Sequence, residues 1–143
     1  MSYSISKIGA ISPTDGLNEE EVKSLKALGL RTTDRLLEAT KDPKGRRLLA
    51  EKTKIEERRL LDCANLCDYM RIKGIGRQYS GLLREVGVST VRELKYRNPA
   101  NLAKVMAEAN KENKLVRFLP PEKFVARWVE HARNLPLKIT YKD

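Results

Sequence analysis

The chain has 143 residues, of which 29 are Lys or Arg and 19 are Asp or Glu, so its formal charge at pH 7 is +10. This length suits one compact domain or two half-domains with a shared core, and it leaves no room for a large catalytic domain. No apolar run approaches the roughly 20 residues of a membrane-spanning helix. The first residues form no charged or apolar leader, so we expect a cytoplasmic protein whose basic charge suits a polyanion.

Helical periodicity, broken by glycine and proline, predicts an all-α fold. The expected helices cover residues 18–28, 33–40, 43–53, 56–70, 77–86, 90–97, 99–112 and 121–134. No strand pattern competes with them. The partly alternating residues near the ends, 3–5 and 138–141, favour at most a short two-stranded contact between the termini.

The chain contains an internal repeat. Residues 25–36 read alongside residues 83–94 at an offset of 58, with glycine, threonine and leucine at matching positions. Asp42–Pro43 matches Asn98–Pro99 at an offset of 56, and each pair offers a side-chain N-cap followed by proline in the first helical position. Thr90 and Glu93 have the spacing of a capping box. We therefore expect two pseudo-repeated units packed as one compact domain, without a low-complexity linker.

The last helix of each copy carries an equivalent inward-facing triplet. The matched residues are Leu60, Cys63 and Cys67 in the first copy and Val125, Trp128 and Ala132 in the second. The two cysteines are therefore expected to be buried core residues. A zinc site would need two further ligands, which a single histidine, His131, does not supply. We expect the first unit at residues 1–70 and the second at residues 71–143. We expect the helix-hairpin-helix of the first unit to be degenerate and that of the second to be intact. No metal site is expected in either unit.

The most informative segment is residues 71–83, in which Gly74, Ile75 and Gly76 form a tight turn before a helix. Glycine permits positive φ and lets another backbone approach closely. The unpaired N–H groups at the start of the following helix, together with the helix dipole, suit a phosphate and cannot read bases. The basic residues in or near this turn are Arg71, Lys73, Arg77 and Arg84. A tight connection between packed helices is the alternative reading.

The excess positive charge is concentrated near this turn. Residues 1–71 hold 14 basic and 12 acidic side chains, net +2, whereas residues 72–143 hold 15 and 7, net +8. The counterpart in the first copy, residues 5–18, lacks the Gly-x-Gly spacing and is followed by three glutamates, Glu19 to Glu21. Those acids favour a helix start but repel phosphate. Any nucleic-acid contact is therefore expected in the second copy.

These motifs resemble a known family. The hairpin at 71–76, the junction at 87–94, the segment 97–102 and the closing stretch 128–136 are similar to the tandem helix-hairpin-helix proteins grouped as DUF4332, a domain of unknown function. The resemblance covers nearly the whole chain and implies an all-α fold of paired helix-hairpin-helix units. Such modules bind DNA without sequence preference through hairpin amides, and some hold a monovalent cation with loop carbonyls. The resemblance therefore implies this role for Gly74, Ile75 and Gly76.

Our leading functional hypothesis is a non-catalytic module that binds nucleic acid, double-stranded DNA above all, through the second hairpin and the basic residues named above. The alternative is a protein-interaction or scaffold domain whose hairpins only join helices. An enzyme is disfavoured, because a helix-hairpin-helix DNA glycosylase needs an aspartate beyond the hairpin and the next one here is Asp143. His131 has no paired nucleophile in its segment and is expected to be a partly exposed surface residue.

Overall fold

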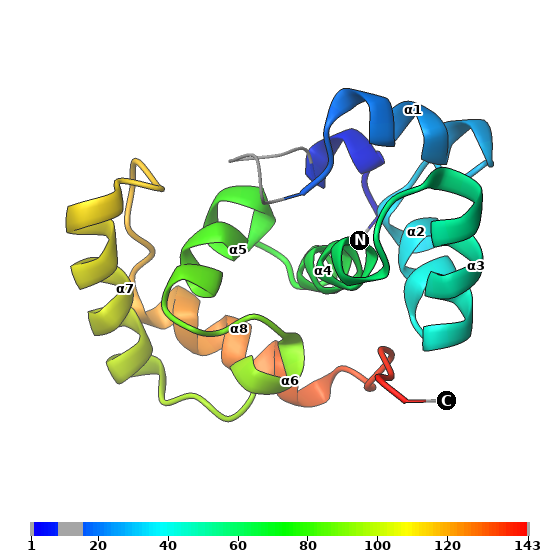
Figure 1. The fold of residues 1–143 in the computed structure, drawn as a ribbon. Coiled ribbons are helices and arrows are strands. Elements are labelled where there is room, and N and C mark those ends of the chain that lie inside the picture. The colour runs from blue at the N-terminus through cyan, green and yellow to red at the C-terminus, as the bar shows by residue number, and fades with distance from the viewer. Residues whose placement is uncertain (1, 9–15, 143) are drawn as a thin grey trace. The chain divides into compact units, whose positions relative to one another are not determined.

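The structure, a computed structural model, describes residues 2–8 and 16–142 and is shown in Figure 1. In these residues every regular element is a helix, so the predicted all-α class is confirmed. The elements are a 3₁₀-helix η1 (Ile5–Ile8) and α-helices α1 (Glu19–Ala27), α2 (Thr33–Thr40), α3 (Pro43–Thr53), α4 (Glu57–Tyr69), α5 (Gly76–Glu85), α6 (Val91–Leu94), α7 (Pro99–Asn113) and α8 (Glu122–Asn134).

The helices form two compact units. Unit 1 comprises Met1–Arg71 together with Lys138–Asp143, and unit 2 comprises Ile72–Leu137. The division along the chain thus falls one residue from the expected boundary between residues 70 and 71. The last residues, which we expected in the second unit, belong to the first.

Seven of the eight expected helices match the observed bounds to within one residue. The exception is α6, which ends at Leu94 although we expected a helix to residue 97. After Leu94 the N–H groups of Tyr96 and Arg97 bond to carbonyls only three residues back, at 3.3 and 3.1 Å. This turn lets Asn98 leave the helical path and cap α7 with its side chain, which accepts from the Asn101 N–H at 3.0 Å.

The N-terminal segment of unit 1 pairs with the chain before α2. The Thr33 N–H donates to the Tyr3 carbonyl at 2.7 Å and the Ile5 N–H to the Arg31 carbonyl at 3.0 Å, around an isolated bridge between Ser4 and Thr32. In the described residues the N-terminal segment thus bridges to residues 31–33 and not to residues 138–141, whose alternating pattern was only a weak signal. Residues 31–33 offer free backbone groups because they precede a helix, and the N-terminal segment uses these instead.

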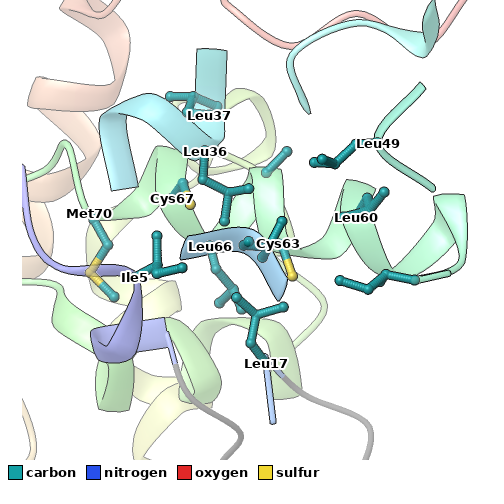
Figure 2. Packing of buried hydrophobic residues seen from close by; sticks show 13 residues of the cluster. Ile5, Leu17, Leu36, Leu37, Leu49, Leu60, Cys63, Leu66, Cys67 and Met70 are labelled. Atoms are coloured by element: carbon teal, nitrogen blue, oxygen red, sulfur yellow. The ribbon is translucent and has the colours of Figure 1, made fainter. Parts of the chain in front are cut away.

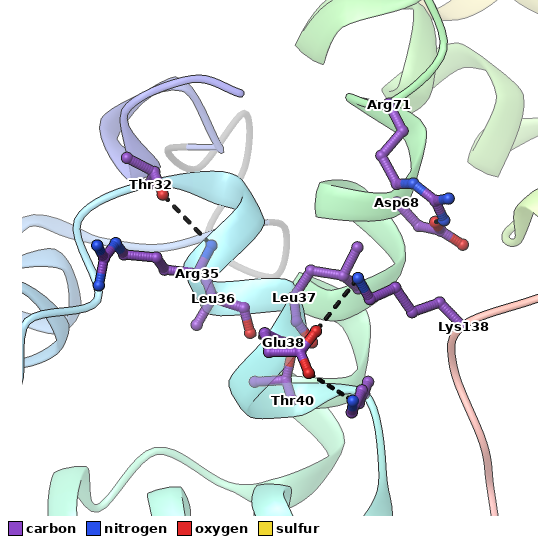
Figure 3. Close-up of polar contacts among 10 residues, drawn as sticks. Thr32, Arg35, Leu36, Leu37, Glu38, Thr40, Asp68, Arg71 and Lys138 are labelled. Carbon is purple, nitrogen blue, oxygen red and sulfur yellow. Dashed lines mark hydrogen bonds and ion pairs between the residues drawn. The ribbon is translucent and has the colours of Figure 1, made fainter. Parts of the chain in front are cut away.

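The C-terminal segment is held in unit 1 by a buried arginine. Arg46, which is 5% exposed, donates to the Thr40 carbonyl at 2.8 Å and to the Thr140 carbonyl at 2.7 Å. The Thr140 N–H donates to the Lys41 carbonyl at 2.7 Å. Figure 3 shows Lys138 reaching Glu38 of α2, and the ion pair measures 3.2 Å. Backbone and side-chain bonds together therefore fasten residues 138–140 to the ends of α2 and α3.

Helix α4 is the centre of unit 1, with α2, α3 and η1 packed against it and α1 against α3. Figure 2 shows Cys63 and Cys67 of α4 among the leucines of the neighbouring elements. Neither cysteine forms a disulfide, and each is 1% exposed. The interpretation of the cysteines as core residues is therefore confirmed. Burial, assisted by the nearby Cys63, raises the pKa of the Cys67 thiol well above its ordinary value.

Unit 2 repeats this packing scheme. Its last helix, α8, packs against α7 and α6, as α4 packs against α3 and α2, and α7 packs against α5, as α3 packs against α1. The inward face of α8 consists of four buried residues, Val125, Trp128, Val129 and Ala132. The predicted inward triplet of this helix is therefore buried, like its counterpart in α4.

Equivalent helix ends have the same local geometry in both units. After α1, Gly29 has a φ of +84°, and the Leu30 N–H bonds to the Leu25 carbonyl at 3.0 Å. After α5, Gly87 has a φ of +87°, and the Val88 N–H reaches back over the same five residues at 2.9 Å. Both ends are Schellman motifs, which need a left-handed residue after the helix.

The helix starts also correspond. Threonine caps α2 and α6, and an Asx side chain followed by proline caps α3 and α7. In the predicted capping box, the Thr90 oxygen accepts from the Glu93 N–H at 3.0 Å, while the Thr90 hydroxyl donates to the Glu93 carboxylate at 3.1 Å. The complete box with both backbone bonds is found at Asn18 and Glu21 of α1. The expected pairing of Thr90 and Glu93 is therefore present at the start of α6.

Candidate nucleic-acid interface

The turn before α5 is built on two left-handed glycines. Gly74 has a φ of +93° and Gly76 a φ of +60°, conformations that side chains with a Cβ rarely adopt. Ile75 lies between them in the right-handed region and is the N-cap of α5, which receives no side-chain cap. The first N–H groups of α5 are therefore not satisfied by a capping side chain and keep their preference for an anion.

Gly74 is also required by its surroundings in unit 2. A Cβ at this position would lie 3.3 Å from the Trp128 indole Nε1, closer than carbon atoms normally approach. Gly76 has nothing within 4 Å of the corresponding position, so only its backbone conformation favours glycine. The sequence predicted both glycines for conformational reasons, and the structure adds a packing reason for the first.

A pocket of about 420 Å³ opens beside this turn, and we call it the hairpin pocket. The turn contributes two lining residues and α8 contributes the others, the full set being Lys73, Gly74, Phe124, Arg127, Trp128 and His131. Lys73 and Arg127 are exposed, and among the described lining residues there is no carboxylate. The pocket therefore combines aromatic walls with a cationic rim.

The aromatic side of the hairpin pocket is held by ring contacts. Trp128 is 3% exposed, and its ring centroid lies 5.3 Å from that of Tyr79 with the planes tilted by 45°. The Tyr79 hydroxyl donates to the Phe118 carbonyl at 2.7 Å, which fixes the tyrosine in turn. Phe124 is 40% exposed, and the Arg127 guanidinium carbon lies 5.3 Å from its ring centroid. Trp128 is therefore held by packing and by the Tyr79 ring, whereas the rim pairs the Arg127 cation with the accessible Phe124 ring.

The predicted site residues are only partly brought together. Lys73 and Gly74 line the hairpin pocket, and Gly76 begins the helix two residues later. Ile75 is 1% exposed and its N–H donates to the Ile72 carbonyl at 3.4 Å, so its side chain belongs to the core. The half-buried Arg84 does not line the pocket. The side chain of the remaining arginine of α5, Arg77, lies outside the described residues.

Arg71, which we had placed near the hairpin, is engaged within unit 1. Figure 3 shows its side chain against Asp68, and the guanidinium nitrogen lies 2.7 Å from the carboxylate. Burial raises the pKa of Asp68, while the hydrogen bond and positive charge of Arg71 act in the opposite direction. Arg71 thus compensates a buried carboxylate, and its charge is largely used there.

Sequence reasoning missed the contribution of α8 to the pocket. Phe124, Arg127 and His131 follow one another at spacings of three and four, so they lie on one face of the helix next to the core face. That stripe was visible in the sequence. Its position beside Gly74 was not, because fifty residues separate the two segments. Trp128 is a core anchor, as expected, and it also forms part of the pocket wall.

The equivalent helix start in unit 1 is already occupied. The Asn18 side chain accepts from the Glu21 N–H at 2.8 Å, and the Glu21 carboxylate accepts from the Asn18 N–H at 3.0 Å. Arg59 of α4 forms an ion pair with the same carboxylate. Residues 9–15, which are half of the expected first hairpin, lie outside the described residues. What is seen of the start of α1 is a capped, acidic helix end.

Two absences apply to the described part of the chain. Residues 2–8 and 16–142 contain no group of three or more His, Cys, Asp or Glu side chains arranged to hold a metal ion. In the same residues, no helix has both the length and the apolar character needed to cross a membrane.

Comparison with known proteins places the chain in a family. Neither a curated protein nor a solved structure shows significant similarity to it. One family model, described as "Domain of unknown function (DUF4332)", matches residues 15–135, which include all eight α-helices. Because this match spans well over half of the sequence, the chain belongs to the DUF4332 family.

Proposed function

We propose that this protein is a non-catalytic nucleic-acid-binding module that contacts the backbone of double-stranded DNA through unit 2. The observation that carries the proposal is the hairpin pocket, where Lys73 and Arg127 flank the glycine turn that leads into an uncapped helix start. Backbone amides and lysine or arginine side chains are the groups that proteins use to hold DNA phosphates.

The charge of the two units supports this assignment. Unit 2, residues 72–137, has 13 basic and 6 acidic side chains, net +7. Unit 1, residues 1–71 and 138–143, has 16 and 13, net +3. The unit with the glycine turn therefore carries most of the charge that attracts a polyanion, although it is the shorter of the two.

The contacts are proposed to be independent of sequence. In this proposal the two units are tandem helix-hairpin-helix repeats of which only the second keeps a working hairpin, at Gly74, Ile75 and Gly76. The N–H groups at the start of α5 receive one phosphate, and Lys73 and Arg127 receive its neighbours. A monovalent cation bound by the carbonyls of the turn is the one cofactor that this arrangement allows.

A second candidate function is a protein-interaction domain, and a groove in unit 1 favours it. The groove measures about 270 Å³ and has a mainly apolar lining, made of Leu28, Leu30, Ala39, Gly45, Leu48, Leu49 and Lys52. Leu28 and Leu48 are 45% and 50% exposed. In this alternative the basic residues are solvated surface and the groove binds another polypeptide. Copurification of a defined protein that survives nuclease treatment, and is lost in Leu48→Asp, would favour it.

The leading proposal is tested by a salt titration of duplex binding, followed by fluorescence anisotropy of labelled DNA. If three to five phosphates are neutralised, log affinity falls against log salt with a slope of about −3 to −4.5. Replacing Lys73 and Arg127 by alanine should make this slope shallower by about 2 and lower the affinity at least about tenfold.

The matched control replaces two exposed cations of unit 1, Lys44 and Arg58, by alanine, which removes the same charge. This control should change affinity by less than about threefold, because neither residue lines the hairpin pocket. Salt-insensitive binding, absence of binding at low ionic strength, or equal losses in the two double variants would refute the proposal.

A further inference from the structure

The hairpin pocket has a composition that a phosphate alone does not explain. A site for backbone phosphates needs cations and N–H groups, and Lys73 and Arg127 supply the cations. The pocket also has walls formed by Phe124 and Trp128, and a volume of about 420 Å³, which is within the range of small-molecule sites. A phosphate held at the rim would leave the ring of Phe124, which is 40% exposed, facing water.

The ring of Phe124 is arranged for stacking. It is 40% exposed although it lies beside a well-packed helix face, and both Arg127 and Lys123 approach it, at 5.3 and 5.8 Å from the ring centroid. Aromatic rings and guanidinium planes are the surfaces on which proteins stack unpaired bases. Ring and cations together therefore suit a ligand that is planar at one end and anionic at the other.

A nucleotide with an unpaired base has this chemistry, whereas the face of a base-paired base is covered by its stacked neighbours and cannot lie on a ring. Resting on the proposed function, we infer that the hairpin pocket holds one unpaired nucleotide of a DNA strand, with its base against Phe124 and Trp128 and its phosphate on Lys73 and Arg127. The module is then a reader of duplex DNA that carries a single-stranded overhang, and the overhang enters the pocket.

The test compares a blunt duplex with the same duplex carrying a short 3′ or 5′ overhang, at one ionic strength, with the full chain and anisotropy as the readout. The overhang should raise affinity about tenfold, as expected for one base stacked on an aromatic surface. Trp128 is the single tryptophan of the chain, so its fluorescence reports the pocket directly. It should be quenched by the overhang DNA and not by the blunt duplex.

Phe124→Ala should abolish the advantage of the overhang, measured in that variant as the ratio of its affinities for overhang and blunt DNA. The matched control is Tyr96→Ala, which removes another exposed ring of unit 2 that is paired with a lysine but does not line the pocket. This control should keep the full advantage. Circular dichroism of both variants checks the fold, and the Trp128 quenching of the parent protein gives an answer that needs no variant.

The outcomes separate this inference from the proposed function. Salt-dependent binding with equal affinity for blunt and overhang DNA would overturn the nucleotide pocket and leave the proposed function standing. Absence of binding to either DNA would overturn both. Thymidine monophosphate that binds as tightly as the overhang DNA would also overturn the inference, because the site would then serve a free nucleotide and not a strand.

Discussion

Units 1 and 2 share a packing scheme but differ at the start of their first α-helix, which is α1 in unit 1 and α5 in unit 2. Helix α1 begins with three glutamates, and its capping box is reinforced by Arg59. Helix α5 begins at a left-handed glycine without a side-chain cap, beside the basic hairpin pocket. The features common to both units, their caps and inward faces, are those that determine helix packing. The difference at the helix start lies on the surface that we propose to bind DNA, and it is therefore the place to test that function.

A second difference lies in the helix that follows the Asx–Pro start. Counting from that start, Arg46 of α3 occupies the position of Leu102 in α7. Both are buried, but the arginine holds the C-terminal segment through Thr140, whereas the leucine is part of an apolar core. A buried arginine is retained only where carbonyls satisfy it. The same structural position can therefore serve packing in one unit and fastening in the other.

The largest expected effect is the protection of the two cysteine thiols from chemical labelling, which reports on unit 1 alone. Both thiols lie in unit 1, and the single tryptophan lies in unit 2. Because Cys63 and Cys67 are buried, a thiol reagent should label them about a thousandfold more slowly in the native protein than in urea. Quenching the labelling reaction at a series of times, in native buffer and in urea, measures the ratio of the two labelling rates. Rapid labelling of the native protein would show that the core of unit 1 opens readily.

The same thiols give a dependence on pH. Because burial raises the folded pKa of Cys67, its contribution to stability is complete below the ordinary thiol pKa of 9.0. That contribution is lost as pH rises from 9.0 through the raised value, since only the unfolded chain then releases the proton. Unit 1 should accordingly unfold at lower urea concentration above this pH, and Cys67→Ala should weaken the effect.

The next largest effect is the difference in stability lost when a left-handed glycine of each unit is replaced by alanine. Gly74→Ala should lower the free energy of unfolding by about 2–3 kcal/mol, because it combines a positive φ with a contact to Trp128. Gly29→Ala in unit 1 has a similar φ but open space around it, and should cost only about 1 kcal/mol. Urea unfolding followed by circular dichroism measures both. Equal losses would mean that the indole contact does not constrain the turn.

A somewhat smaller loss of stability is expected when Arg46 of unit 1 is replaced by leucine, the residue at the equivalent position of unit 2. Arg46→Leu removes the bonds to the Thr40 and Thr140 carbonyls and should cost about 2 kcal/mol. It should also expose residues 138–142 to limited proteolysis, which mass spectrometry of the products would reveal. Arg46→Lys, which keeps the charge but not the fork of donors, should show the same change more weakly. An unaltered digestion pattern would contradict the fastening role.

The smallest effect distinguishes two neighbouring cations. Arg71→Gln should leave DNA affinity within about twofold, in contrast to Lys73→Ala, and should cost about 1 kcal/mol of stability near neutral pH. Asp68, with its raised pKa, contributes stability that is present below the ordinary carboxyl pKa of 3.8 and lost as pH rises through the raised value. Without Arg71 the pKa rises further, so the deficit of the variant should shrink as pH falls. A deficit independent of pH would contradict this pairing.

Much of the fold could be predicted because its signals are local. Asx–Pro starts, threonine caps and glycine ends lie within a few residues of the helices that they bound, so seven helices were placed to within one residue. The inward faces of α4 and α8 followed from helical spacing for the same reason. The predicted length of α6 was too great because the end of this helix is decided by the cap of the next helix and not by its own residues.

The sequence by itself determined the helices, the left-handed glycines, the buried cysteines and the half of the chain that carries the charge. Only the tertiary structure decided which groups meet. It brought Phe124 and Arg127 beside Gly74, paired Arg71 with Asp68, and returned the C-terminal segment to Arg46. The reason is physical: caps and turns depend on neighbours in the chain, whereas a pocket, an ion pair or a fastened terminus depends on packing between segments far apart in sequence.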